Sequence, residues 1–198
     1  MPTLTVRIGR RSREYRLGLP GEHRVLTSLA VFAALFALDA DIDAALPHFA
    51  SVTVPKGRGN AVPAGNATVI DDSYNANPVS MRFALEALAV EEGRRVAILG
   101  EMLELGDDTR AMHAEIEPAC TDLDGVITVG DGFRDWGSSL GDRHWAHVAS
   151  VAELDLEALA DRIMVDGTNA TILVKGANKV FWVNQFVDSL STALAASG

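Results

Sequence analysis

Cysteine is almost absent from this sequence, in which Cys120 is the only one among 198 residues. A single cysteine excludes an internal disulfide and any metal site built from several thiolates. Cys120 follows Pro118 and Ala119 at the end of a helical pattern. We therefore expect a buried or half-buried structural thiol.

Lysine is scarce too, since the chain has only Lys56, Lys175 and Lys179. None of them follows a glycine, so the phosphate-binding motif G-x-x-x-x-G-K-[ST] is absent from the sequence. No predicted strand is followed by the Gly-rich turn G-x-G-x-x-G, which argues against a dinucleotide-using enzyme. His144 and His147 lack neighbouring ligands in the sequence, and we predict no metal site.

Long apolar runs and an excess of positive charge are both missing. The longest apolar stretch, residues 29–38, is about half as long as a membrane span. The N-terminal segment, residues 1–17, lacks the apolar centre of a signal peptide. The net charge of −10 and the pI near 4.9 argue against nucleic acid or an anionic membrane as the main partner. The sequence predicts a cytoplasmic protein without nucleic-acid binding or membrane insertion.

The first part of the chain reads as a small hairpin followed by helices. Residues 3–8 and the run around Tyr15 alternate apolar with polar side chains, which is typical of two paired strands. Residues 22–38 predict a helix too apolar all round for a protein surface, and residues 42–49 predict a shorter one. Residues 51–66 are rich in proline and glycine, and we interpret them as a boundary loop.

The rest of the chain alternates strands with helices. Strands are predicted at 67–70, 95–100, 125–130, 144–148 and 170–175, and helices at 78–90, 109–120, 133–139, 151–164 and 179–195. This alternation indicates an α/β fold with a mostly parallel sheet and helices on both faces. Right-handed crossovers would wind it as a Rossmann-like fold, whose ligands gather at the carboxyl ends of the strands.

Three loops at that edge carry unusual residues, namely 71–78, 100–106 and 175–179. The first holds two aspartates, amides and a tyrosine, which could bind a ribose, a metal or an ammonium group. Simple capping by Asn77, with Pro78 at the first helical position, explains only those two residues. The acidic second loop is a weak signal, because a solvated turn would look the same.

The third loop combines two lysines with a predicted helix N-terminus, which would suit a carboxylate or a phosphate. A solvated lysine beside a turn glycine is an equally good interpretation. Arg58 lies in the boundary loop, where it could reach a phosphate or simply lie on the surface. His23 and His113 are similarly ambiguous, and a lone histidine at a helix start is more often structural.

Taken in order, four segments resemble MurF-type members of the Mur ligase family: KGR at 56–58, IDDSYNANP at 70–78, VAILGEMLELG at 96–106 and VKGANK at 174–179. The resemblance covers roughly residues 18–195, and the second and third segments are its most specific part. It implies an ADP-forming ligase of peptidoglycan precursor synthesis that uses ATP and Mg²⁺. Such a ligase adds D-Ala-D-Ala to UDP-MurNAc-tripeptide.

The resemblance also implies domains and site residues. Residues 1–55 would be the end of the central ATPase domain, and 56–198 the C-terminal domain that receives the amino acid or dipeptide. It assigns catalytic roles to Arg58 and Asp72, nucleotide contacts to Arg58, Asp72, Tyr74 and Asn75, and substrate contacts to Asn75, Asn77, Lys175 and Gly176.

Two residues depart from the family pattern, because Arg24 and Thr27 occupy positions where the family usually has asparagine. The first asparagine helps to hold the adenine, and a guanidinium cannot reproduce the paired donor and acceptor of an amide. With the phosphate loop also missing, we expect the isolated chain to fold but to lack ligase activity.

Three hypotheses remain at this point. The chain is part of a ligase and acts only with the missing domains, for example when a separate protein supplies the ATPase domain. Alternatively, it is a non-catalytic module that binds a dipeptide, a nucleotide or a Mur partner, which the altered asparagine positions favour. The third hypothesis is an unrelated Rossmann-like enzyme.

Overall fold

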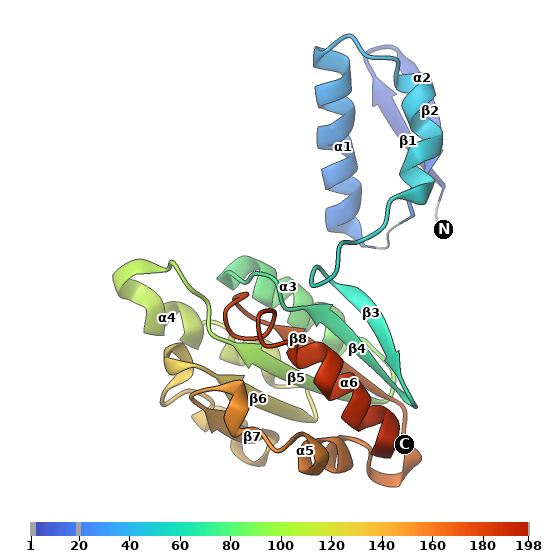
Figure 1. The fold of residues 1–198 in the computed structure, drawn as a ribbon. Helices are drawn as coiled ribbons and strands as arrows, with labels where there is room; N and C mark the ends of the chain where they lie inside the picture. Colours follow the sequence, from blue (N-terminus) through green and yellow to red (C-terminus); the bar gives the residue numbers. More distant parts are fainter. Residues whose placement is uncertain (1–2, 19–20, 198) are drawn as a thin grey trace. The chain divides into compact units, whose positions relative to one another are not determined.

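The computed structural model describes residues 3–18 and 21–197 (Figure 1). The chain divides into two compact units, Met1–Val54 and Pro55–Gly198. Within the described ranges, no helix has both the length and the apolar character that crossing a membrane requires.

The first unit is a β-hairpin with helices. The antiparallel strands β1 (Thr3–Ile8) and β2 (Arg11–Arg16) form the predicted hairpin, and α1 (Glu22–Ala37) follows. The predicted helix at 42–49 is instead a short α2 (Ile42–Ala45) continued by a 3-10 turn, Leu46–Ser51. Pro47 explains the change, because proline lacks the N–H that an α-helix needs.

Three aromatic rings form the centre of this unit. Phe32 and Phe49 stack with ring centroids 4.5 Å apart, and Tyr15 meets both rings edge-on. The Tyr15 hydroxyl also lies 2.6 Å from the Ser28 hydroxyl of α1. The buried side of α1 is thereby fixed against the hairpin.

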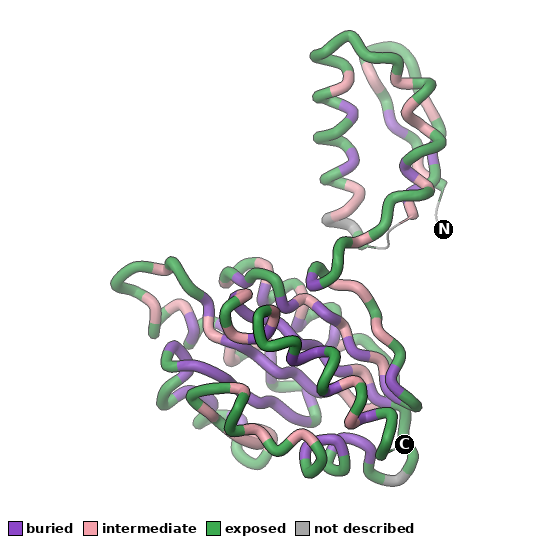
Figure 2. The backbone as a smooth tube through the Cα atoms, in the orientation of Figure 1, coloured by how far each residue is buried: buried purple, intermediate pink, exposed green. Residues whose placement is uncertain are grey.

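The opposite side of α1 is exposed, contrary to the expectation of burial all round (Figure 2). Leu26 and Phe36 are 62% and 64% exposed, and Leu29 is 42% exposed. No charged residue interrupts this helix between Arg24 and its end. An apolar stripe therefore runs along the outer side of α1.

The second unit is built on a six-stranded sheet in the order β3-β4-β8-β5-β6-β7. The strands are β3 (Asn60–Ala64), β4 (Ala67–Asp72), β5 (Arg94–Gly100), β6 (Gly125–Val129), β7 (His144–Val148) and β8 (Ala170–Lys175). All neighbours are parallel except β3, which pairs antiparallel with β4. The predicted boundary loop therefore contains a strand, and its Pro63 is tolerated because β3 is at the edge of the sheet.

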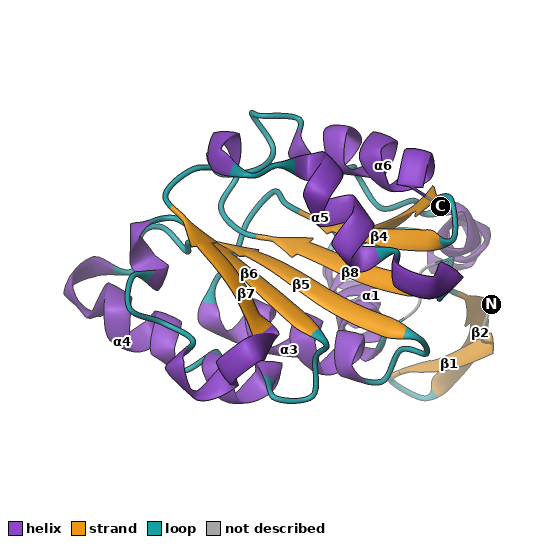
Figure 3. Ribbon diagram, turned by 90° about the horizontal axis from the view of Figure 1, so that it is seen from below, coloured by secondary structure: helices purple, strands orange, loops and turns teal. Residues whose placement is uncertain are grey.

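Helices cover both faces of this sheet (Figure 3). α5 (Leu156–Ile163) and α6 (Phe186–Ser197) pack on one face, and α3 (Pro78–Ala89) and α4 (Thr109–Ala114) on the other. This arrangement confirms the predicted Rossmann-like α/β class.

Several predicted helices are shorter than expected. The 109–120 helix ends at Ala114 and resumes as a 3-10 turn around Pro118, while Asp155 caps α5 and separates it from residues 151–153. The predicted helix at 133–139 is replaced by 3-10 turns at Asp131–Phe133 and Ser138–Arg143.

The last helix begins at Phe186, not at residue 179. Gln185 has a φ of +50°, a left-handed conformation that cannot lie inside an α-helix. The 175–179 loop is consequently followed by turns, and the helix N-terminus predicted beside it is not there.

Cys120 is fully buried, as predicted, and belongs to a 3-10 turn that packs on the sheet. Burial, with a smaller contribution from the charge of Glu117, raises the pKa of this thiol to about 12. A thiol in this state is a poor nucleophile, so its role is packing.

Candidate functional site

The site of the second unit lies at the carboxyl ends of its central parallel strands. β8 lies between β4 and β5, and Lys175 at its end is the register partner of Asp72 on β4 and of Leu99 on β5. The loops at 71–78, 100–106 and 175–179 therefore emerge at one edge, as the parallel topology predicted.

A buried ion pair joins two of these strands. The Lys175 ammonium donates to a carboxylate oxygen of Asp72 at 2.5 Å and to the backbone carbonyl of Asn75 at 3.2 Å. The Lys175 side chain is only 3% exposed, and that of Asp72 is 25% exposed. The lysine predicted to face a substrate is thus held inward, where it neutralises the aspartate.

The 71–78 loop is fixed by bonds within itself. The carboxylate of Asp71 is fully buried and accepts bonds from the hydroxyl and the N–H of Ser73, at 2.5 and 3.3 Å. The Asn75 side chain is exposed and accepts a bond from Ala76 N–H. Asn77 caps α3 in a reciprocal arrangement with Ser80, so the simple capping interpretation of this asparagine holds.

Arg58 and Tyr74 are brought together although they come from different loops. The guanidinium carbon of Arg58 lies 4.2 Å from the centre of the Tyr74 ring. Trp182 meets the same ring edge-on, with centroids 5.7 Å apart. Tyr74 is 37% exposed, so this stack lies at the surface of the unit.

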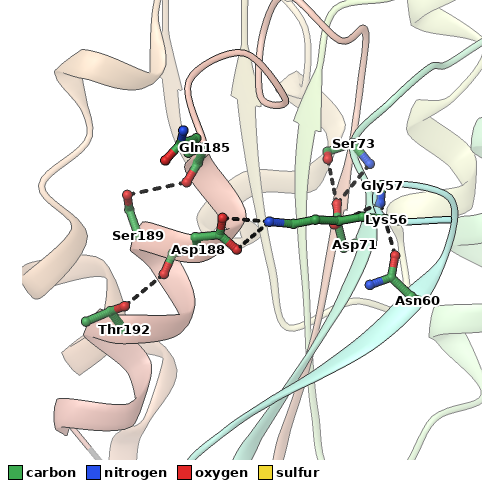
Figure 4. A network of polar contacts seen from close by, with 9 residues as sticks. All are labelled: Lys56, Gly57, Asn60, Asp71, Ser73, Gln185, Asp188, Ser189 and Thr192. Carbon is green, nitrogen blue, oxygen red and sulfur yellow. Dashed lines mark hydrogen bonds and ion pairs between the residues drawn. The ribbon is translucent and has the colours of Figure 1, made fainter.

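A pocket of about 290 Å³ opens beside this stack, on the α6 side of the sheet. Its lining mixes charged, polar and aromatic side chains: Lys56, Asp71, Ser73, Phe181, Trp182, Gln185, Phe186, Val187 and Asp188. Lys56 donates to both carboxylate oxygens of Asp188, at 2.7 and 2.9 Å (Figure 4). Both side chains of this pair are more than half exposed.

His113 fixes the 100–106 loop by hydrogen bonds. Its Nε2 accepts a bond from Met102 N–H at 2.9 Å, and its Nδ1 lies 2.6 Å from the Thr109 carbonyl. This pattern requires a neutral ring with its proton on Nδ1. Burial lowers the pKa of His113, partly offset by the Thr109 carbonyl and the charge of Glu101. Histidine here is structural.

Gly176 lies where the backbones of two loops meet. A Cβ at this position would come within 2.7 Å of the Gly100 Cα and 2.8 Å of the Phe181 ring. The residue is buried, so close backbone packing requires the absence of a side chain here.

Other predicted or ambiguous residues lie elsewhere. Arg24 and Thr27 belong to α1 in the first unit, and the side chain of His23 lies outside the described residues. His144 and His147, although well separated from any ligand in sequence, both lie about 3 Å from the Thr128 hydroxyl, at 3.0 and 3.1 Å. In the described part of the chain, no group of three or more His, Cys, Asp or Glu side chains could hold a metal ion.

Two features of the site were not predicted. The Lys56–Asp188 pair joins residues 132 positions apart, and Trp182 lies in a segment that the sequence assigned to a helix. No feature of the sequence pointed to Trp182, which is half-buried shortly after the 175–179 loop. Nothing in the local sequence indicates the partner of Lys56.

Comparison with known proteins gives a consistent result. The family described as "Mur ligase, glutamate ligase domain" matches residues 57–178. The chain is 32% identical over 166 residues to the UDP-N-acetylmuramoyl-tripeptide–D-alanyl-D-alanine ligase of Escherichia coli K12, covering 81% of this chain and 35% of that protein. For the protein of the same name from Mycobacterium tuberculosis CDC 1551, the identity is 36% over 170 residues, with coverages of 81% and 32%.

Solved structures agree with the sequence matches. A crystal structure of MurF from Acinetobacter baumannii superposes with a TM-score of 0.83 at 27% identity, covering 96% of this chain and 42% of that one. MurF from Thermotoga maritima in complex with ADP shares the fold, with a TM-score of 0.76 at 22% identity over 94% of this chain and 42% of that one. The chain spans about a third of the length of the two curated relatives.

Replacing Lys175 by methionine should destabilise the second unit. The substitution leaves Asp72 without its ionic partner, and we expect a loss of about 3 kcal/mol in unfolding free energy. Urea titration measures this loss. Lys179→Met removes an exposed lysine four residues away and is the control. A Lys175→Met, Asp72→Leu double variant should recover part of the loss, and equal effects of the two single lysine changes would contradict the assignment.

Stability should also fall in mild acid. The pKa values of His113 and His144 are both lowered, chiefly by burial and, for His144, also by the charge of His147. The unfolded chain then binds protons from pH about 6.5 downward before the folded chain does, so stability is lost as the pH falls through this range. Urea titrations between pH 8 and pH 5 measure the slope. His113→Gln should make it shallower by up to about 1.4 kcal/mol per pH unit, and an unchanged slope would speak against this account.

Proposed function

This chain belongs to the Mur ligase family, and we propose that it forms the acceptor-side part of an ATP-dependent, MurF-type amide ligase in the cytoplasm. The proposed reaction joins D-alanyl-D-alanine to UDP-N-acetylmuramoyl-tripeptide, the substrates in the names of the relatives. Because the chain spans about a third of those relatives, the proposal includes a further part that carries the phosphate loop.

The observation that carries this proposal is the stack of Arg58 on Tyr74. The two residues come from two separate motifs of the family, and they meet only in the folded unit. A guanidinium can stack by its face while its edge donates to phosphate oxygens. An exposed Arg58 held in this way is suited to stabilise the negative charge that develops during phosphoryl transfer.

Lys175 and Asp72 have a supporting role in the proposal. The ammonium neutralises Asp72 and also holds the carbonyl of Asn75, so it sets the shape of the loop that faces the incoming dipeptide. Gly176 lets its own backbone lie close to that of Gly100, so the 175–179 loop is held beside the 100–106 loop. These residues orient and bind, and none of them needs to exchange a proton.

The residues of this chain fit ATP only in part. When bound, ATP supplies the phosphoryl group that activates the substrate carboxylate. Arg58 and Tyr74 can contact it, but the sequence has no phosphate loop. The described residues also offer no cluster of three metal-binding side chains, so no Mg²⁺ site is proposed within them. Nucleotide and metal must therefore be held chiefly by the other part of the ligase.

The exposed stripe on α1 is the proposed attachment site for that other part. A helix that is apolar on all sides is stable in water only when both sides are covered. In the first unit the hairpin covers one side, while Leu26, Leu29 and Phe36 remain exposed. A folded P-loop domain, in the same polypeptide or in a separate protein, is the occupant that the proposed reaction requires.

Arg24 and Thr27 support the alternative of a non-catalytic binding module. They replace the asparagines expected on this helix, and the first replacement removes an amide acceptor that adenine recognition uses. Such a module would bind the dipeptide, a nucleotide or a Mur partner without supporting turnover.

A reconstitution assay separates these functions. The purified chain, given UDP-MurNAc-tripeptide, D-Ala-D-Ala, ATP and Mg²⁺, should release no ADP above the blank. Addition of a MurF lacking its own C-terminal domain should restore ADP release that depends on both substrates. Arg58→Ala should lower the restored rate about 100-fold or more, because it removes a charged donor to the phosphates.

Arg82→Ala is the matched control, since Arg82 is an exposed arginine on α3 away from the stack. ADP release by the chain alone would contradict the need for a second part. Dipeptide binding without restored turnover would decide for the binding module.

Charges placed on the α1 stripe should prevent association with the P-loop part. Leu29→Lys with Phe36→Lys is expected to weaken binding at least tenfold, because two desolvated lysines would enter an apolar contact. Both positions are exposed, so the first unit should keep its helical circular dichroism. Ala34→Lys, at an exposed position on another side of α1, is the control. Equal binding of the P-loop part by the unaltered chain, the Leu29→Lys/Phe36→Lys variant and the Ala34→Lys variant would refute the attachment site.

A further inference from the structure

Asp71 is a fully buried carboxylate that the roles proposed above do not use. Successive residues of a strand point to opposite faces of the sheet. Val69 belongs to the core on the α6 side and Ile70 packs on the α3 side, so Asp71 faces α6 and Asp72 faces α3. The side chains of the two adjacent aspartates therefore lie on different faces of the sheet, and of the two only Asp72 pairs with Lys175.

The Asp71 carboxylate joins two loops (Figure 4). One oxygen accepts the N–H of Gly57 at 3.0 Å, and the other accepts the hydroxyl and N–H of Ser73. The backbone adds two further links, because Gly59 donates to the Asp71 carbonyl at 2.7 Å and Tyr74 donates to the Gly57 carbonyl at 3.0 Å. Residues on both sides of Arg58 are thus bonded to Asp71.

Gly57 leaves little freedom to the loop that carries Arg58. Its φ is +79°, and a Cβ would lie 2.7 Å from the Trp182 ring and 3.2 Å from Tyr74. The Gly57 backbone therefore packs directly against the Trp182 ring, and its N–H donates to the Asp71 carboxylate. Arg58 follows directly, and this fixed start directs its side chain over Tyr74.

Two further contacts hold the same loop, because the Gly57 N–H is shared with the Asn60 amide oxygen at 3.0 Å and Lys56 pairs with Asp188. The Asn60 acceptor is uncharged, and the Lys56–Asp188 pair is weakened by solvent. Both side chains of that pair are more than half exposed, and exposed ion pairs are screened by water and salt. The Asp71 carboxylate is inaccessible to water, and charged acceptors form the stronger hydrogen bonds under such conditions. Asp71 therefore dominates the placement of the loop.

We propose that Asp71 is a positioning residue that fixes Arg58 above Tyr74 by holding Gly57 and Ser73 at the same time. It touches neither substrate nor nucleotide and acts through Arg58. The placement of Arg58 is a claim about the folded chain alone, whereas its consequence for turnover rests on the proposed function.

Nuclear magnetic resonance of the isotope-labelled full chain tests the placement. In the unaltered protein the Arg58 side-chain protons should be shifted upfield by the Tyr74 ring. Asp71→Ala should remove this shift and accelerate hydrogen exchange of the Gly57 amide about tenfold, while the amides of β5 and β6 keep their protection. A retained Arg58 shift with unchanged Gly57 exchange would overturn the proposal.

Asp71→Asn should rescue part of the effect. Its amide oxygen can still accept from Gly57 while its NH₂ group donates to the Ser73 hydroxyl, so we expect exchange about threefold faster than in the unaltered protein. If the core amides of Asp71→Ala lose their protection, Asp71→Asn replaces it as the test variant. Gly57 exchange in Asp71→Asn that is as slow as in the unaltered protein would then overturn the proposal. Asp161→Ala, which removes an exposed aspartate of α5, is the control and should leave both Gly57 and Arg58 unchanged.

The reconstituted ligase tests the consequence for turnover. Asp71→Ala should lower kcat, and combining it with Arg58→Ala should lower kcat no further than Arg58→Ala alone, because both changes act through one guanidinium. Multiplicative losses would overturn the link to Arg58. An inactive unaltered ligase would instead refute the proposed function and leave the magnetic resonance result standing.

Discussion

The ion pair between Lys175 and Asp72 is the constraint from which the site is built. It joins the ends of β8 and β4, two strands that are neighbours in the sheet and about a hundred residues apart in the chain. A buried ammonium without this partner would be strongly unfavourable. The loop after β4 must therefore turn toward β8, which brings the Asn75 carbonyl onto the same ammonium.

The alternation of side chains along β4 then divides the work between two neighbouring aspartates. Asp72 is directed to the α3 face and to Lys175, while Asp71 is directed to the α6 face and to the loop that carries Arg58. A shift of the strand by one residue would exchange these surroundings and place each carboxylate opposite the wrong donors. The register of β4 with β8 therefore matters to the site as much as the identity of its residues.

Periodicity was sufficient to predict most of the fold, because β/α alternation and the hairpin depend on local patterns of apolar residues. It failed where tertiary contacts decide. Asn60–Ala64 contains proline and looked like a loop, yet it pairs with β4 because an edge strand tolerates a missing N–H. Residues 179–185 have helical spacing, but Gln185 adopts a left-handed conformation and the helix starts only after it.

The candidate site was less accessible to sequence reasoning than the fold. Motifs indicated Arg58, Asp72, Tyr74 and Lys175, but not that Lys175 is turned inward or that Arg58 stacks on Tyr74. The role proposed for Asp71 could not be foreseen, since it depends on a backbone N–H fourteen residues away and backbone donors carry no sequence signature. In the sequence, an aspartate next to Asp72, for which the family resemblance predicts a catalytic role, looks like a second ligand. The geometry separates the two carboxylates, because that of Asp72 pairs with Lys175 whereas that of Asp71 accepts bonds from Gly57 and Ser73.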